Sequence, residues 1–148
     1  MSVGGAFYAI DRYRLRGLVI DPATVSGLIN KPAGQGGPND SQTVEQAWDV
    51  VQTLLPEAVD GEPLDGTDGL GCIYLTASHV ERSAARLAQR SVPKLVRLFA
   101  EEPAPYAELY WARVWLEDVD ALQAFMEGVQ RFFAEAAARR DAVVFYMA

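Results

Sequence analysis

The C-terminal stretch LQAFMEGVQRFFAEAAARRDAVVFYM, residues 122–147, decides the fold that this sequence predicts. Its first part repeats apolar residues three and four positions apart, which predicts an amphipathic helix with one continuous apolar face. Asp118 or Asp120 would begin this helix, and the RR pair at its end suits the helix dipole. Residues 142–147 then form a short apolar run that predicts a buried strand. The apolar face consists of Leu122, Phe125, Met126, Val129, Phe132, Phe133 and Ala136.

The rest of the chain predicts shorter elements that would pack against this unit. Asp11 and the Asp21-Pro22 pair would each begin a helical segment, because Asp and Pro are favoured at helix N-termini. Residues 106–116 fit a strand or a helix equally well. Strands are predicted at 6–10 and 72–75, helices at 41–55, 76–90 and 93–100, and loops at 31–40 and 57–71.

A few strands dispersed among helices are typical of an α+β fold. We therefore expect a small mixed β-sheet packed by several α-helices, in a single compact domain over residues 1–148. The strands at 6–10 and 142–147 are expected to lie near each other in that sheet.

The composition argues against several classes of function. The chain has 148 residues, a formal net charge of −7, one Cys and one His. One Cys and one His argue against a disulfide framework and against a Cys-cluster or multi-His metal centre, so no metal or cofactor is expected. The acidic balance argues against nucleic-acid binding. Neither a secretory signal nor a membrane span is recognisable, which predicts a cytoplasmic protein.

Charge is distributed unevenly along the chain. No Lys or Arg occurs between Lys31 and Arg82, whereas the stretch from Arg82 to Ala100 contains only basic charges. Arg82, Arg86 and Arg90 are spaced to lie along one side of a helix, where they could form an anion-binding stripe or a solvated face. The acidic loop at 57–71 could bind a cation or be a hydrated surface loop, but it lacks the ligand order of an EF-hand.

Catalytic motifs are weak. Cys72 and His79 could form a thiolate dyad, although Cys72 sits in an apolar strand and is expected to point into the core. A nucleophile elbow is missing, and the two Gly-rich segments match neither common phosphate-binding pattern. The aromatic residues are the better candidates for a ligand or partner surface, although Trp48 also fits the core. These candidates are Trp48, Tyr74, Tyr106, Tyr110, Trp111 and Trp115.

Four segments in order resemble the bacterial YfbM-like family, a domain of unknown function. They are AFYAI at the start, EQAWDVVQTLL around Trp48, IYLTASHVERSAARLA around Tyr74, and RFFAEAAARRDAVVFYM at the end. The resemblance spans nearly the whole chain and implies a small α+β fold with no established activity. Where the family commonly has His after its Ala-Trp pair, this chain has Asp49 and Gln52, so a polar site of relatives would not be shared.

Two classes of function remain open. The first is a noncatalytic binding or protein-interaction module, for example an immunity-type protein whose acidity steers it toward a basic toxin domain. The second is a small-ligand-binding protein or a hydrolase-like enzyme, with a pocket near Trp48, Tyr74 and carboxylates of the acidic loop. A protein or a small molecule is thus the expected partner, with no nucleic acid and no membrane. The oligomeric state stays open.

Overall fold

The computed structural model describes residues 3–109 and 111–148. Over these residues the strands form one sheet in the order β2-β1-β5-β4-β3. Every strand pairing is antiparallel, so the sheet does not mix strand directions. The α+β class expected from the sequence is confirmed. The strands are β1 (Gly5–Ile10), β2 (Asp40–Glu45), β3 (Glu62–Pro63), β4 (Gly71–Leu75) and β5 (Ala142–Met147).

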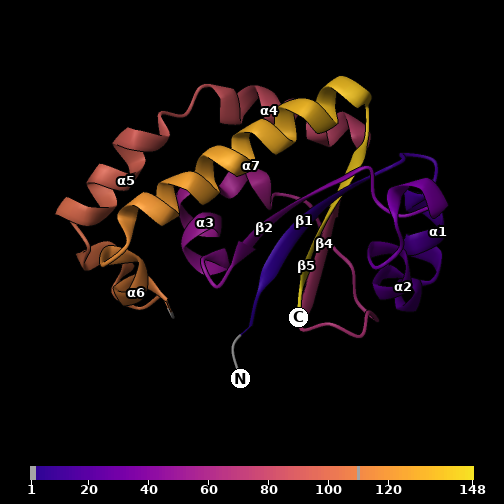
Figure 1. Cartoon of the computed structure of the whole chain (residues 1–148), viewed down its shortest axis with the longest axis horizontal. Helices are drawn as coiled ribbons and strands as arrows, with labels where there is room; N and C mark the ends of the chain where they lie inside the picture. Colours follow the sequence, from indigo (N-terminus) through magenta and orange to yellow (C-terminus); the bar gives the residue numbers. More distant parts are fainter. Residues whose placement is uncertain (1–2, 110) are drawn as a thin grey trace.

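Helices cover both faces of the sheet, unequally (Figure 1). The larger group packs on the face that contains Phe7 and Phe145, and the two short helices α1 and α2 lie on the opposite face. The helices are α1 (Leu15–Ile20), α2 (Val25–Ile29), α3 (Trp48–Leu54), α4 (Ala77–Ala88), α5 (Val92–Glu101), α6 (Ala112–Leu116) and α7 (Val119–Arg139). Single 3₁₀ turns lie at Pro22–Thr24, Ala33–Gln35, Pro56–Ala58 and Ala104–Tyr106.

The C-terminal unit has the predicted structure. The Asp118 side chain accepts a hydrogen bond from the Ala121 N–H and caps α7. Nearly the whole predicted face of α7 is buried, and Phe125 is partly buried. Strand β5 pairs with β1 on one side and β4 on the other, which confirms the expected proximity of the first and last strands. Because helices lie on both faces, β5 is apolar on both, and its alternate residues belong to two separate core clusters.

The helix predicted at 41–55 is wrong in its first half. Residues 40–45 form β2, and only Trp48–Leu54 are helical. Val44 satisfies the helical spacing that continues to Val51, but it equally satisfies a strand with one buried face, and pairing with β1 decides for the strand. Ser41 is therefore a strand residue and caps no helix.

Other boundaries shift for local reasons. Asp11 accepts a hydrogen bond from the Tyr13 N–H in a turn, and α1 begins later, at Leu15. Helix α5 begins at Val92, one residue before the predicted start at Pro93. Its buried residues are Val92, Val96 and Phe99, and Leu98 is 41% exposed. The acidic loop contains the 3₁₀ turn and the short strand β3, and the ambiguous segment 106–116 ends in helix α6.

No helix within the described residues combines the length and the apolar character that crossing a bilayer requires.

Candidate functional site

A hollow of about 680 Å³ opens on the α2 side of the sheet. It exists because α1 and α2 are only one to two turns long and leave part of β1 and β2 uncovered. Side chains of β1 and β2 that point away from α7 form its floor, and the end of α2 forms one wall. The lining residues are Gly4, Gly5, Ala6, Tyr8, Ser26, Ile29, Asn30, Thr43, Glu45, Gln46, Tyr146 and Ala148.

Hydrogen-bonding groups dominate this hollow. Hydroxyls come from Tyr8, Ser26 and Thr43, and amides come from Asn30 and Gln46. Glu45 supplies a carboxylate, and the lining set contains no Lys, Arg or His among the described residues. The arrangement suits a polar ligand and, of the two charge signs, favours a cation.

Asp68, near the C-terminal end of the acidic loop, links two lining residues of the hollow, Ser26 in α2 and Tyr146 in β5. Its Oδ2 accepts a hydrogen bond from the Ser26 hydroxyl at 2.9 Å, and its Oδ1 accepts one from the Tyr146 hydroxyl at 3.0 Å. These bonds favour the charged carboxylate, so the hydrogen bond from Ser26 and then that from Tyr146 lower the pKa of Asp68. The acidic loop is thus tied to α2 and β5 at this point rather than wholly hydrated.

The two tyrosines of the hollow are poor general bases. Burial raises the pKa of Tyr8 above its ordinary value of 10.0. Burial, followed by the hydrogen bond to Asp68, likewise raises the pKa of Tyr146. Both phenols therefore stay protonated at neutral pH and act as hydrogen-bonding groups.

Glu45 is held in a backbone conformation that side chains rarely adopt. Its φ is +45°, in the left-handed region, at the end of β2 where the pairing with β1 shifts register between Gly5 and Ala6. Gly5 must be small here, because a Cβ would lie 2.8 Å from Cζ of Phe145. Non-glycine residues in this region cost roughly 1–3 kcal/mol and cluster at functional sites. Glu45, the residue with the strained backbone, is thus also the charged residue that lines the hollow.

The pocket expected near Trp48, Tyr74 and the acidic loop is not formed as one site. Trp48 packs against the core on the α7 side, and its indole N–H donates to the Val3 carbonyl at 2.9 Å. Tyr74 packs against the cluster on the opposite face and lines a separate hollow beside α1. The two side chains thus lie on different faces of the sheet.

The later aromatic cluster contributes mainly to packing. The Tyr106 ring lies 5.3 Å from that of Phe99, and Trp115 is only 8% exposed and meets Phe125 edge-on. Trp115 is therefore a core residue rather than part of a surface. Trp111 is partly buried, and its backbone N–H donates to Asp49. Tyr110 lies outside the described residues.

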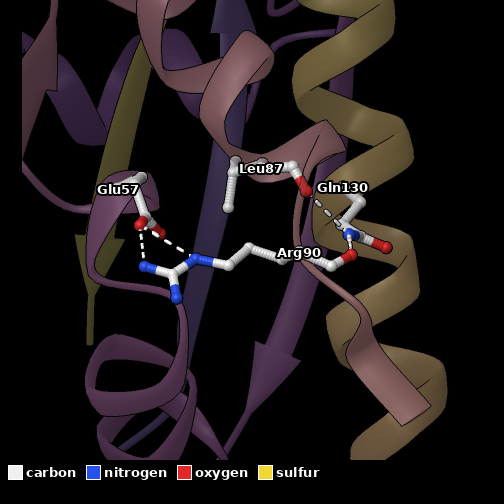
Figure 2. Close-up of polar contacts among 4 residues, drawn as sticks. All are labelled: Glu57, Leu87, Arg90 and Gln130. Atoms are coloured by element: carbon white, nitrogen blue, oxygen red, sulfur yellow. Dashed lines mark hydrogen bonds and ion pairs between the residues drawn. The ribbon is translucent and has the colours of Figure 1, made fainter. Parts of the chain in front are cut away.

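The predicted arginine stripe is shorter than expected. Arg82 and Arg86 are exposed on α4, but α4 ends at Ala88, and Arg90 points elsewhere. Figure 2 shows its guanidinium on Glu57, with Nε 3.0 Å from Oε1 and Nη2 bonded to the same oxygen. The Arg90 carbonyl also accepts from Gln130 Nε2 at 2.9 Å. Arg90 therefore joins the α4–α5 junction to the turn at 56–58 and to α7.

The Cys72–His79 dyad is not assembled. Cys72 is buried in the cluster under α1 and α2, and this burial raises the pKa of its thiol to about 11. His79 lies in the first turn of α4, with its Nε2 3.8 Å from Asp60. A thiol with so high a pKa is a weak nucleophile at neutral pH. Residues 3–109 and 111–148 contain no group of three or more His, Cys, Asp or Glu side chains placed to hold a metal ion.

Sequence reasoning missed the residues of the hollow, Tyr8, Ser26, Asn30 and Glu45. They belong to no motif, and they meet only because short helices leave part of a sheet face open. The Asp21-Pro22 pair predicts the helical segment that includes α2 and forms one wall of the hollow. Nothing in the sequence predicts the left-handed backbone conformation of Glu45.

Comparison with known proteins supports a family assignment without a function. The fold is similar to the crystal structure of YfbM from Escherichia coli, a protein of unknown function, with a TM-score of 0.73 and 13% sequence identity. The match covers 98% of this chain and 99% of that chain. At this identity the likeness establishes the fold alone. No curated protein matches the chain. A model of a domain of unknown function, DUF1877, matches residues 1–146, and the chain therefore belongs to the DUF1877 family.

Proposed function

We propose that this protein is a noncatalytic, cytoplasmic binding protein whose α2-side hollow takes a small polar ligand with a positively charged group. The observation that supports this most directly is the lining: one carboxylate, several hydroxyls and amides, and no Lys, Arg or His among the described residues. A volume of about 680 Å³ lies within the usual range of small-molecule sites.

Charge supports a cationic ligand over an anionic one. Glu45 lines the hollow, and the Asp68 carboxylate accepts hydrogen bonds from two other lining residues, Ser26 and Tyr146. The whole chain has a net charge of −7, which adds a long-range attraction for cations. An ammonium or amidinium group near Glu45, with its other polar atoms on Thr43 and Asn30, fits this pattern.

The chemistry of the lining favours binding over catalysis. The phenols of Tyr8 and Tyr146 are kept protonated, and the Ser26 hydroxyl donates to the Asp68 carboxylate. These groups can hold and orient a ligand. A cytoplasmic location agrees with a free, buried Cys72.

Calorimetric titration with agmatine, putrescine and ethanolamine tests this proposal. We expect at least one amine to bind the wild-type protein and to raise its Tm, because ligand binding stabilises the folded state. Glu45→Gln should abolish the effect, whereas Glu62→Gln, an equal charge change on β3, should leave it intact. Failure of all three amines to bind, or equal binding by both variants, would overturn the proposal.

A basic protein partner is the second candidate, with an immunity-type role as one version. The acidic loop exposes Asp60, Glu62 and Asp65, and the neighbouring Leu70 is 71% exposed. An apolar residue beside solvent-facing acids suits a partner with a basic surface. If this is the function, a basic toxin domain encoded beside this protein should bind it, and Glu62→Lys with Leu70→Ser should weaken the complex while Glu45→Gln does not.

A further inference from the structure

Four arginines from opposite ends of the sequence meet at one corner of the molecule. Strands β1 and β5 are paired with Ile10 opposite Ala142, so the residues that follow β1 lie beside those that precede β5. Figure 1 shows the end of α7 and the chain entering α1 at this same end of the sheet. We call this group the arginine rim, and it consists of Arg12, Arg16, Arg139 and Arg140 around Tyr13.

Two hollows adjoin the rim. The first, of about 300 Å³, is lined by Arg12, Tyr13, Arg139 and Arg140 together with two acids, Asp11 and Asp141. The second, of about 510 Å³, shares Arg12 and Tyr13 and adds Arg16, the hydroxyls of Tyr74, Thr76 and Ser78, and the apolar Leu15 and Val19. No Asp or Glu lines the second hollow among the described residues.

The acids near the rim are mostly engaged already. Asp141 is 4% exposed and accepts hydrogen bonds from Arg139 Nε at 2.8 Å and from Asn39 at 3.1 Å. Asp11 accepts from the Tyr13 N–H, and Glu81 lies near enough to interact with the charge of Arg12. Arg16 and Arg140 have no side-chain partner among the described residues, so the corner keeps cations available for an anion.

Tyr13 gives the rim an aromatic surface. Tyr13 is 77% exposed, although tyrosine residues are usually at least partly buried. The Arg12 guanidinium lies over the ring, 4.8 Å from its centroid, and Arg12 Nη2 donates to the Tyr13 hydroxyl at 2.8 Å. Arg12 is thereby held at the boundary between the two hollows.

We propose that the arginine rim binds a phosphate monoester with an aromatic or apolar group, a site separate from the α2-side hollow. The phosphoryl oxygens would accept hydrogen bonds from Arg12 and Arg140, because guanidinium groups match phosphate geometry and retain their charge. The remainder of the ligand would lie against Tyr13 and the apolar wall of Leu15 and Val19. A phosphate monoester offers three acceptor oxygens and more negative charge than a carboxylate, so it can engage both guanidinium groups at once.

Phenyl phosphate is the probe that tests this site, with inorganic phosphate at equal ionic strength as the reference. We expect phenyl phosphate to bind the wild type and to raise its Tm more than inorganic phosphate does. The double variant Arg12→Gln with Arg140→Gln should weaken binding about tenfold or more, as loss of charge-assisted hydrogen bonds requires. The matched control, Arg82→Gln with Arg86→Gln on α4, changes the net charge equally and should bind as the wild type does.

Tyr13→Ala separates a specific site from general attraction. It should weaken the binding of phenyl phosphate more than that of inorganic phosphate, because the aromatic surface serves only the phenyl group, whereas the hydroxyl that holds Arg12 is lost for both ligands. The proposal is overturned if the wild type does not bind phenyl phosphate, if both arginine pairs weaken it equally, or if Tyr13→Ala has no effect. Binding of a glutamate-rich peptide without phenyl phosphate would also overturn it, and would assign the rim to an acidic protein. Glu45→Gln should not alter any of these results, which keeps this test independent of the α2-side hollow.

Discussion

At the scale of single residues, Glu45 combines a strained backbone with the charge of the hollow. Its φ of +45° suits glycine, so we expect Glu45→Gly to raise the free energy of unfolding by about 0.5–1 kcal/mol as strain is relieved. The same change should abolish amine binding. Urea denaturation measures the first effect. Glu62→Gly, on the extended strand β3, should instead lower the free energy of unfolding. If both variants lost stability, the backbone of Glu45 would not be strained.

The ionisation of Asp68 makes the contact between α2 and β5 at the hollow depend on pH. Its pKa lies below the ordinary value of 3.8 in the folded protein, so it contributes stability above that pH. As pH falls through the lowered pKa, the carboxylate gains a proton and this contribution disappears. We expect Asp68→Asn to flatten the acid side of the Tm profile and to speed amide exchange in α2. Asp65→Asn, in the same loop, should change neither, and an unchanged profile in Asp68→Asn would contradict the role.

At the scale of elements, the Glu57–Arg90 pair holds the turn at 56–58 to the α4–α5 junction. The Glu57 side chain is 11% exposed, and its Oε2 is buried with no hydrogen-bond partner among the described residues. Arg90→Ala would leave this carboxylate unpaired and should lower the free energy of unfolding by about 2 kcal/mol. This loss is smaller than is usual for removing one partner of a fully buried ion pair, because the Arg90 side chain is partly exposed to solvent. Chemical denaturation of the variants measures the cost.

A double-mutant cycle provides the control for that pair. Adding Glu57→Gln to Arg90→Ala removes the unpaired charge and should recover about half of the lost stability. Arg86→Ala, an exposed arginine on α4, should change stability by less than about 0.5 kcal/mol. Strict additivity of the two substitutions would show that the pair does not act as a unit.

Element types were predictable where one pattern dominated. The period of α7 and the apolar run of β5 are local signals, and each gave the observed element. The helix predicted from residue 76 is also present, and the Thr76 hydroxyl caps it by accepting a hydrogen bond from the His79 N–H. The first half of residues 41–55 was not predictable, because Val44 fits both a helix and a strand. The decision comes from pairing with β1, more than 30 residues away. Long-range pairing is invisible to local periodicity.

The site residues were less predictable than the elements for the same reason. Helical spacing predicted that Arg90 belongs to the arginine stripe, but in the structure Arg90 is paired with Glu57. The arginine rim was not predictable, because Arg12 and Arg140 are distant in sequence and meet only in the fold. Aromatic density at 106–116 suggested a surface, yet Trp115 fills the core where α6 meets α7. The hollow beside α2 depends on how much of a sheet two short helices cover, which no residue pattern encodes.

At the scale of the whole molecule, charge is clustered in space as well as in sequence. Asp68 ties the acidic loop to α2 and β5, and Asp60 lies beside His79 on α4, whereas the arginine rim lies at the end of the sheet where β1 leads into α1 and α7 leads into β5. The net charge of −7 therefore conceals a basic corner. The proposed site for a cationic ligand and the proposed site for an anionic ligand share none of their lining residues.

The stability of the whole molecule should fall at alkaline pH because of one buried thiol. The pKa of Cys72 rises from 9.0 to about 11 on folding, so between these values the unfolded chain loses a proton that the folded chain keeps. Ionisation then favours the unfolded state, and stability decreases as pH rises through that window. We expect a loss of about 2 kcal/mol between pH 9 and 11, measured by urea denaturation. Raised pKa values of Tyr8 and Tyr146 add a loss of the same sign above pH 10.

The Cys72→Ala variant provides the control. It should be less stable than the wild type at pH 8, yet its free energy of unfolding should decrease less between pH 9 and 11. Parallel curves for the two proteins would show that the thiol is not the cause.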